Sequence, residues 1–207
     1  MASIRPLPDG PLAGKRIGVL MENDFAEDEI AYFERRFAEE GAHVELLTRL
    51  WGRDSLTFHG HVHRGEVRVT GDLEALGYHE LSRLSALVVP GGMVADRLRY
   101  SEDVGREAPA VRLMRRAFGI PHLVKAFSCH GLLLLSAAKE LIRGRPVTCH
   151  NNLVADVRNM GADYLDQDLV VDGDLITSRS ADHCHLLART VIETLARPGG
   201  AAAGAAA

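Results

Sequence analysis

Short apolar segments rich in Val, Ile and Leu recur along the chain and alternate with longer amphipathic segments. Four of the apolar segments have the length of buried strands: Arg16–Met21, His43–Thr48, Ser85–Val89 and His122–Ser128. Strands that are apolar on both faces and separated by helices indicate a largely parallel sheet that is covered on each side. The pattern therefore predicts a doubly wound α/β fold.

Segments with helical spacing lie between or after these strands: Glu27–Glu40, Ser101–Phe118, Gly131–Leu141 and Ala181–Leu195. Gly41 follows the first of them at the position where a helix usually ends. This order of strands and helices favours a flavodoxin-like arrangement, with a mostly parallel sheet flanked by helices.

Two signals for hairpins accompany the main pattern. Asp172-Gly173 lies between LVV and LIT, where a two-residue turn between two strands is favoured. Residues 57–69 alternate polar and apolar side chains and predict a small accessory β-ribbon. The ribbon and the hairpin are expected to be additions to the main sheet.

The chain ends differ in composition from the part between them. Residues 1–14 are rich in Pro and Gly, and residues 198–207 are one Pro followed by Gly and Ala, so both are expected to be tails. Residues 15–197 then form one domain, because a chain of 207 residues is short for two. The 46% hydrophobic and 25% charged residues are typical of a globular protein.

The charge distribution argues against a nucleic-acid or membrane partner. The formal net charge is −4, and the Lys and Arg residues are scattered along the chain rather than gathered in one basic block. The N-terminus lacks the apolar core of a signal peptide, and no apolar run reaches the roughly 20 residues that span a bilayer. We therefore expect a cytoplasmic protein.

The three cysteines are the first candidates for chemistry. Cys129, Cys149 and Cys184 show no CxxC spacing, so they are expected to be thiols. Cys129 lies where a predicted strand turns into a predicted helix, in the segment SCHG, which is typical of a nucleophile elbow. The helix N-terminus would lower the pKa of the Cys129 thiol. Otherwise, a free cysteine is most often a small buried apolar side chain.

Three alternating histidines give a weaker signal. On a strand, His59, His61 and His63 would face one side and could chelate zinc or another transition metal. The exposed polar face of a ribbon predicts the same pattern, and no further carboxylate or thiol lies at ligand spacing. We therefore expect neither a metal nor another cofactor.

Several motifs in order resemble the ThiJ/PfpI superfamily, which has the class I glutamine amidotransferase-like fold. They are ENDFAEDEI, VVPGGMVADRLR, AFSCHGLLLLSAA and the long segment from RGRPVTCHNN to SRSADH. The likeness covers about residues 15–196. The superfamily includes PfpI-type intracellular proteases, glyoxalases and deglycases, and isonitrile hydratases.

The resemblance implies roles for individual residues. Cys129 would be the nucleophile and Glu29 the carboxylate that faces it, although without the resemblance a solvated acid in the first turn of a helix is the favoured interpretation of Glu29. The Pro-Gly-Gly loop with Gly91 and Gly92 would bind substrate, and the N–H groups of Gly92 and His130 would stabilise an oxyanion.

The proton-transfer partner of Cys129 has two candidates. By resemblance to the proteases, His130 would pair with an acid from a neighbouring subunit, for which Asp96 is the matching residue. By resemblance to the deglycases, His150 would serve instead. The family often has an acid at the position of Ala26, so this chain departs from it there. The resemblance also implies a homodimer or a larger homo-oligomer.

We expect an enzyme in which Cys129 attacks an electrophilic carbon of a small molecule, such as an aldehyde, ketoaldehyde, amide or isonitrile-like group. Such an enzyme would be a hydrolase, a hydratase or a glyoxalase- or deglycase-like protein. A second interpretation is a non-catalytic redox-sensing or stress-response protein that uses the same low-pKa thiol. A third, suggested by Ala26 and Asp96, is a specialised biosynthetic tailoring enzyme.

Overall fold

A computed structural model describes residues 4–197, and the tail expected at residues 198–207 lies outside them. Seven strands form the main sheet in the order β10-β11-β7-β6-β1-β2-β5. Their bounds are β1 Arg16–Leu20, β2 His43–Thr48, β5 Gly71–Asp72, β6 Ala86–Val89, β7 Val124–Ser128, β10 Leu169–Asp172 and β11 Leu175–Ser178. All neighbouring pairs are parallel except β10 and β11, which confirms the predicted doubly wound α/β fold.

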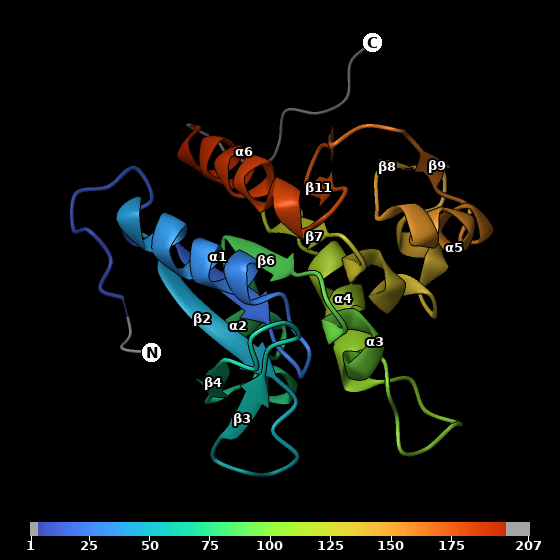
Figure 1. Ribbon diagram of the computed structural model, residues 1–207, viewed down its shortest axis with the longest axis horizontal. Coiled ribbons are helices and arrows are strands. Elements are labelled where there is room, and N and C mark those ends of the chain that lie inside the picture. The colour runs from blue at the N-terminus through green and yellow to red at the C-terminus, as the bar shows by residue number, and fades with distance from the viewer. Residues whose placement is uncertain (1–3, 198–207) are drawn as a thin grey trace.

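Helices cover the sheet on both faces (Figure 1). The α-helices are α1 Glu27–Glu39, α2 Tyr78–Ser82, α3 Val94–Leu98, α4 Pro109–Phe118, α5 Val154–Asn159 and α6 Cys184–Ala196. Helices α1 and α6 lie side by side over one face, and α2, α3 and α4 pack together behind the sheet. Among residues 4–197, no helix is long and apolar enough to cross a membrane.

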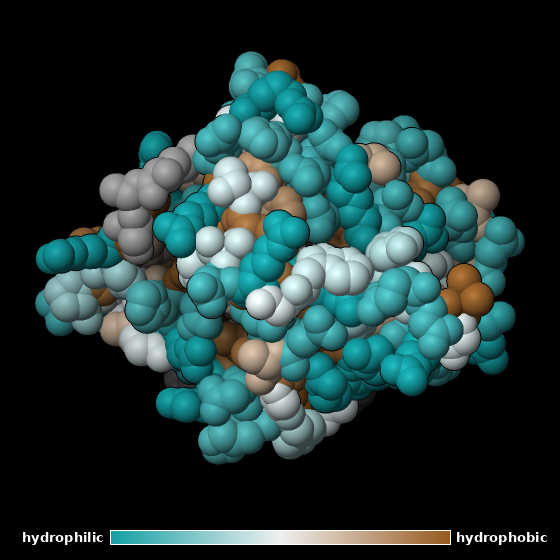
Figure 2. All heavy atoms as spheres, turned by 90° about the horizontal axis from the view of Figure 1, so that it is seen from below, coloured by the Kyte–Doolittle hydropathy of each residue, from teal (hydrophilic) through white to brown (hydrophobic). Residues whose placement is uncertain are grey.

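Two small two-stranded sheets complete the fold. The predicted accessory ribbon is confirmed as β3 Leu56–His59 paired with β4 Glu66–Val69. The other sheet, β8 Pro146–Val147 with β9 Asp163–Tyr164, lies beside α5 (Figure 1). Figure 2 shows a face on which polar side chains predominate and apolar atoms occur in small scattered areas.

Some predicted element bounds are wrong. The helix expected from Ser101 begins only at Pro109, because proline at the first helical position fixes the helix start. The two-residue hairpin turn is Gly173-Asp174 rather than Asp172-Gly173, since Asp172 still pairs with Leu175. The segment expected to precede the domain also packs on it, with Leu12 fully buried.

The helix expected at Gly131–Leu141 is also wrong. Two short 3₁₀ helices, η2 Gly131–Leu135 and η3 Lys139–Leu141, replace it. In η2, residues 131, 132, 134 and 135 are all buried. Three residues per turn bring 131 onto the face of 134 and 132 onto the face of 135, so the tighter winding buries both pairs.

Candidate active site

Cys129 lies on a sharp turn at the carboxyl end of β7. Its backbone is in the left-handed region, with φ at 56°, and its N–H donates to the Ser178 carbonyl at 3.0 Å. A Cβ on Gly131 would lie only 2.6 Å from the Val89 carbonyl oxygen, so glycine permits the close approach of η2 to the sheet. The strained backbone and the following glycine confirm the predicted elbow.

Three backbone N–H groups from three separate segments of the chain face the Cys129 sulfur and favour its thiolate form. They belong to Gly92, His130 and Ala181. The resemblance implied the first two as donors to an oxyanion, and that role stays a prediction. Ala181 was missed, because every residue except proline has an N–H and the sequence carries no signal for which one faces the sulfur.

Glu29 is a buried carboxyl close to the same sulfur. Its Oε2 accepts a hydrogen bond of 2.7 Å from the Gly91 N–H, while Oε1 has no partner among residues 4–197. A Cβ added to Gly91 would lie 3.1 Å from Glu29 Oε2 and 3.5 Å from Cys129 Sγ. Glycine therefore lets the carboxyl and the sulfur converge. The Gly91 N–H donates to Glu29, and the substrate-binding role of Gly91 stays a prediction.

Burial changes the ionisation of both groups. It raises the pKa of Glu29 to about 7, although the nearby Ser128 hydroxyl and the Gly91 N–H oppose the change. Burial, followed by the negative charge of Glu29, raises the pKa of Cys129 to about 11. The predicted low pKa of this thiol is wrong, because desolvation outweighs the three N–H donors and the expected helix is only the short η2. Cys129 is a thiol at neutral pH.

The histidine that contacts the sulfur is His130. Its Nδ1 lies 3.1 Å from Cys129 Sγ. Burial, and then the neighbouring His150, lower the pKa of His130, so its imidazole is neutral and able to accept a proton at pH 7. The His150 ring stacks on the His130 ring at 4.8 Å between centroids, and its Nδ1 contacts Asn152 Oδ1. Both candidate histidines lie near Cys129: His130 contacts the sulfur, and His150 packs against the His130 ring.

Asp96 is occupied by its own helix. Its Oδ1 accepts hydrogen bonds from Arg99 Nε at 3.0 Å and from Nη2 at 2.6 Å. Within the described part of this chain, the carboxylate thus pairs with Arg99 and not with His130. A role for Asp96 beside His130 requires a second subunit and stays a prediction.

The alternating histidines do not share a strand. Strand β3 ends at His59, and His61 and His63 belong to the loop that follows, so the basis of the metal interpretation is wrong. Across residues 4–197, no three His, Cys, Asp or Glu side chains come together as a metal site. One of the three, His61, instead lines a cavity at Cys129.

A cavity of about 280 Å³ opens onto the sulfur, and its lining is almost entirely apolar. We call it the Cys129 pocket; it is lined by Ala26, His61, Val62, Gly92, Met93, Cys129 and His130. The sequence pointed to Cys129, His130 and Gly92, but not to the wall made by Val62 and Met93. These two residues lie on separate loops and carry no chemical signal of their own.

Comparisons with known proteins show which family the chain resembles. The sequence pattern of the DJ-1/PfpI family matches residues 15–194. Protein/nucleic acid deglycase 2 of Escherichia coli strain K12 is 32% identical over 183 residues, covering 87% of this chain and 98% of that protein. Putative cysteine protease YraA of Bacillus subtilis strain 168 is 28% identical over 182 residues, with the same two coverages.

A solved structure is similar over most of the chain. It is a two-domain protein from Anabaena variabilis with DJ-1/ThiJ/PfpI-like and ferritin-like domains. The match has a TM-score of 0.77 and 28% identity, and it covers 93% of this chain and 50% of that longer one. Together with the family match and the elbow at Cys129, these likenesses assign the chain: it belongs to the DJ-1/PfpI family.

Proposed function

We propose that this chain is a cysteine-dependent enzyme that acts on an electrophilic carbon of a small molecule, such as an aldehyde, a ketoaldehyde or an amide. The observation that carries the proposal is the 3.1 Å contact between Cys129 Sγ and His130 Nδ1 at a pocket of about 280 Å³. A deglycase and a putative cysteine protease among the relatives support it.

The first chemical step is a proton-coupled attack. As the S–C bond forms, the thiol proton of Cys129 passes to Nδ1 of neutral His130, and the π electrons of the carbonyl move onto its oxygen. The N–H groups near the sulfur, those of Gly92 and Ala181 among them, stabilise the negative charge on that oxygen. The proton on His130 is then available for the oxygen or for a leaving group.

Glu29 is suited to move a second proton. With a pKa of about 7, it is close to half protonated at neutral pH, and a general acid or base is most effective near that point. Its position beside Gly91 brings the buried carboxyl close to the sulfur. We assign Glu29 the role of an internal proton donor and acceptor for intermediates on Cys129.

The redox-sensing interpretation fits these observations less well. Peroxide reacts with thiolates, and burial together with Glu29 opposes thiolate formation at Cys129. Self-association remains part of the proposal, because Asp96 gains a role beside His130 only across an interface. Sedimentation of the purified chain tests it, and a monomer at micromolar concentration would remove that role.

A substrate panel tests the enzyme proposal. Wild type, Cys129→Ala and the control Cys149→Ala are assayed with aldehydes, ketoaldehydes, amides, isonitriles and short peptides. We expect turnover of at least one class, a loss of about a thousandfold or more in Cys129→Ala, and little change in the control. Full turnover by Cys129→Ala on every active substrate would show that this thiol is not the nucleophile.

A further inference from the structure

The loop that joins β3 to β4, residues 60–65, reaches away from its ribbon to the amino end of α1 (Figure 1). We call this loop the ribbon tip. Gly60 bridges to Phe25, and the His61 N–H donates to the Phe25 carbonyl at 2.9 Å. These contacts bring His61 and Val62 to the Cys129 pocket, although the ribbon itself lies outside the main sheet.

The carboxylate of Glu27 holds the ribbon tip from inside its turn. Glu27 Oε1 accepts hydrogen bonds from the N–H groups of Val62, at 3.1 Å, and His63, at 2.7 Å. A Cβ on Gly60 would lie about 2.1–2.2 Å from atoms of the Glu27 side chain, so glycine makes room for the carboxylate. Hydrogen bonds between N–H groups and a charged acceptor are stronger than neutral ones, so Glu27 fixes the shape of the tip.

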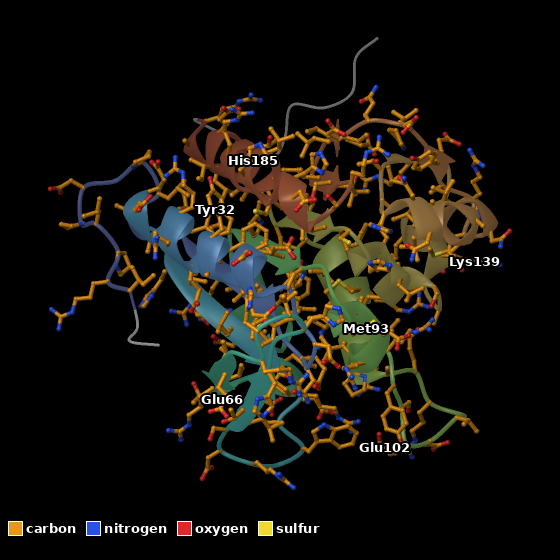
Figure 3. All side chains as sticks on the ribbon, viewed as in Figure 1. Tyr32, Glu66, Met93, Glu102, Lys139 and His185 are labelled. Carbon is orange, nitrogen blue, oxygen red and sulfur yellow. The ribbon has the colours of Figure 1, made fainter. Side chains whose placement is uncertain are left out.

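Asp24 ties the ribbon tip to the opposite wall of the pocket. Its carboxylate pairs with Arg64 of the tip at 2.9 Å and with Arg97 of α3. Its carbonyl accepts a hydrogen bond of 3.0 Å from the N–H of Met93. Figure 3 labels Met93 at the start of α3. Asp24 therefore links the ribbon tip on one side of the pocket mouth to Met93 and the start of α3 on the other side.

The walls held in this way are apolar and partly open to solvent. The side chain of Val62 is 68% exposed and that of Met93 is 41% exposed, so both lie at the mouth. Such exposure of aliphatic side chains beside a reactive thiol leaves surface for a ligand to cover. An anionic substituent against Val62 and Met93 would lose its hydration without gaining a partner from these two side chains, whereas a neutral apolar one gains contact.

We propose that the ribbon tip is the specificity wall of the Cys129 pocket. Val62 contacts the substituent next to the reacting carbon and favours neutral apolar groups over anionic ones, and Glu27 is the positioning residue that holds Val62 there. The inference rests on the proposed function in that the same pocket receives the substrate. The selectivity of the pocket is measurable without any turnover.

The test compares two reagents that alkylate thiols, neutral phenacyl bromide and anionic iodoacetate, at Cys129. Peptide mass spectrometry gives both rates at 0.15 M salt, where exposed charges are screened beyond about 8 Å. The preference is the ratio of the phenacyl bromide rate to the iodoacetate rate. We expect this ratio at Cys129 of wild type to be at least tenfold higher than at a free peptide thiol. Val62→Lys reduces that preference at least tenfold, whereas the control Val104→Lys, at a fully exposed valine outside the pocket, leaves it unchanged.

A second pair of variants tests the clamp. Glu27→Gln replaces the charged acceptor of two N–H groups, and we expect the preference to fall toward that of a free thiol. Asp28→Asn neutralises the next acid of the same helical turn, which is exposed, and leaves the preference as in wild type. Fully buried Cys149 reports folding, because it stays unmodified in folded protein.

Each outcome bears on one proposal. If Val62→Lys and Glu27→Gln keep the wild-type preference in folded protein, the ribbon tip does not select the ligand. If both lower it while Cys129→Ala keeps full turnover on active substrates, the specificity wall stands and the proposed reaction fails. A wild-type preference equal to that of a free thiol overturns the inference at once.

Discussion

Replacing Glu29 by Gln removes a fully buried ionisable group beside Cys129 with little change in size. Burial raises the pKa of Glu29 from an ordinary 4.5 to about 7. The folded protein therefore keeps this proton up to about pH 7, whereas the unfolded chain releases it near pH 4.5. Between these values the native state binds more protons than the unfolded state, so the contribution of Glu29 to stability falls as the pH rises.

The size of the effect follows from the two pKa values. A difference of about 2.5 units at 1.36 kcal/mol per unit corresponds to about 3 kcal/mol. This stability is fully present below pH 4.5 and is lost once the pH exceeds 7. Gln stays neutral throughout. As the pH rises from 4.5 to 8, the unfolding free energy of Glu29→Gln should therefore increase by about 3 kcal/mol relative to that of wild type.

Urea unfolding of wild type and Glu29→Gln at half-unit steps from pH 4.5 to pH 8 measures this difference. The amide retains an acceptor for the Gly91 N–H but leaves its own N–H₂ group without a partner, which adds an offset that does not depend on pH. The prediction is tested by how the difference in unfolding free energy between Glu29→Gln and wild type changes with pH. A difference that stays constant within about 0.5 kcal/mol across the range would refute a buried, titrating Glu29.

Three further predictions concern the elbow and its donors. Ala181→Pro removes one N–H that faces the sulfur, at a 3₁₀ helix start that suits proline, and should lower kcat about tenfold or more, while Ala181→Gly keeps it. Steady-state kinetics on the active substrate decide this, and equal rates would remove Ala181 from the site. His130→Gln should lower kcat about a hundredfold or more, and His150→Gln much less, because only the first loses the contact with Sγ. Gly131→Ala should destabilise the fold by about 1–3 kcal/mol in urea unfolding, since its Cβ meets the Val89 carbonyl; no destabilisation would contradict the close approach.

The parts of the fold that follow from local pattern were predictable from the sequence. The strands β1, β6 and β7 are almost entirely buried, as their apolar runs predicted, whereas in β2 only Leu47 and Thr48 are buried. The elbow at Cys129 was recognisable because a strand runs directly into a His-Gly turn. Glu29 required the resemblance, since its sequence context alone favours a solvated acid.

Features set by tertiary contacts were not predictable in the same way. The raised pKa of Cys129 depends on how much water the surrounding chain excludes, and the sequence suggested the opposite direction from local geometry alone. The 3₁₀ winding of η2 follows from burial on two faces. Ala181 reaches the sulfur and Val62 reaches the pocket from segments far from Cys129 in sequence, and neither residue type indicates such a role.

The pH dependence of alkylation at each cysteine tests the account most directly. Iodoacetamide is reacted with the native protein from pH 6 to pH 10.5, and peptide mass spectrometry follows Cys129, Cys149 and Cys184 separately. The account predicts that Cys129, the cysteine lining the pocket, is modified first, and that its rate keeps rising above pH 9 because its pKa is about 11. A rate at Cys129 that levels off below pH 8, or modification of Cys184 before Cys129, would contradict it.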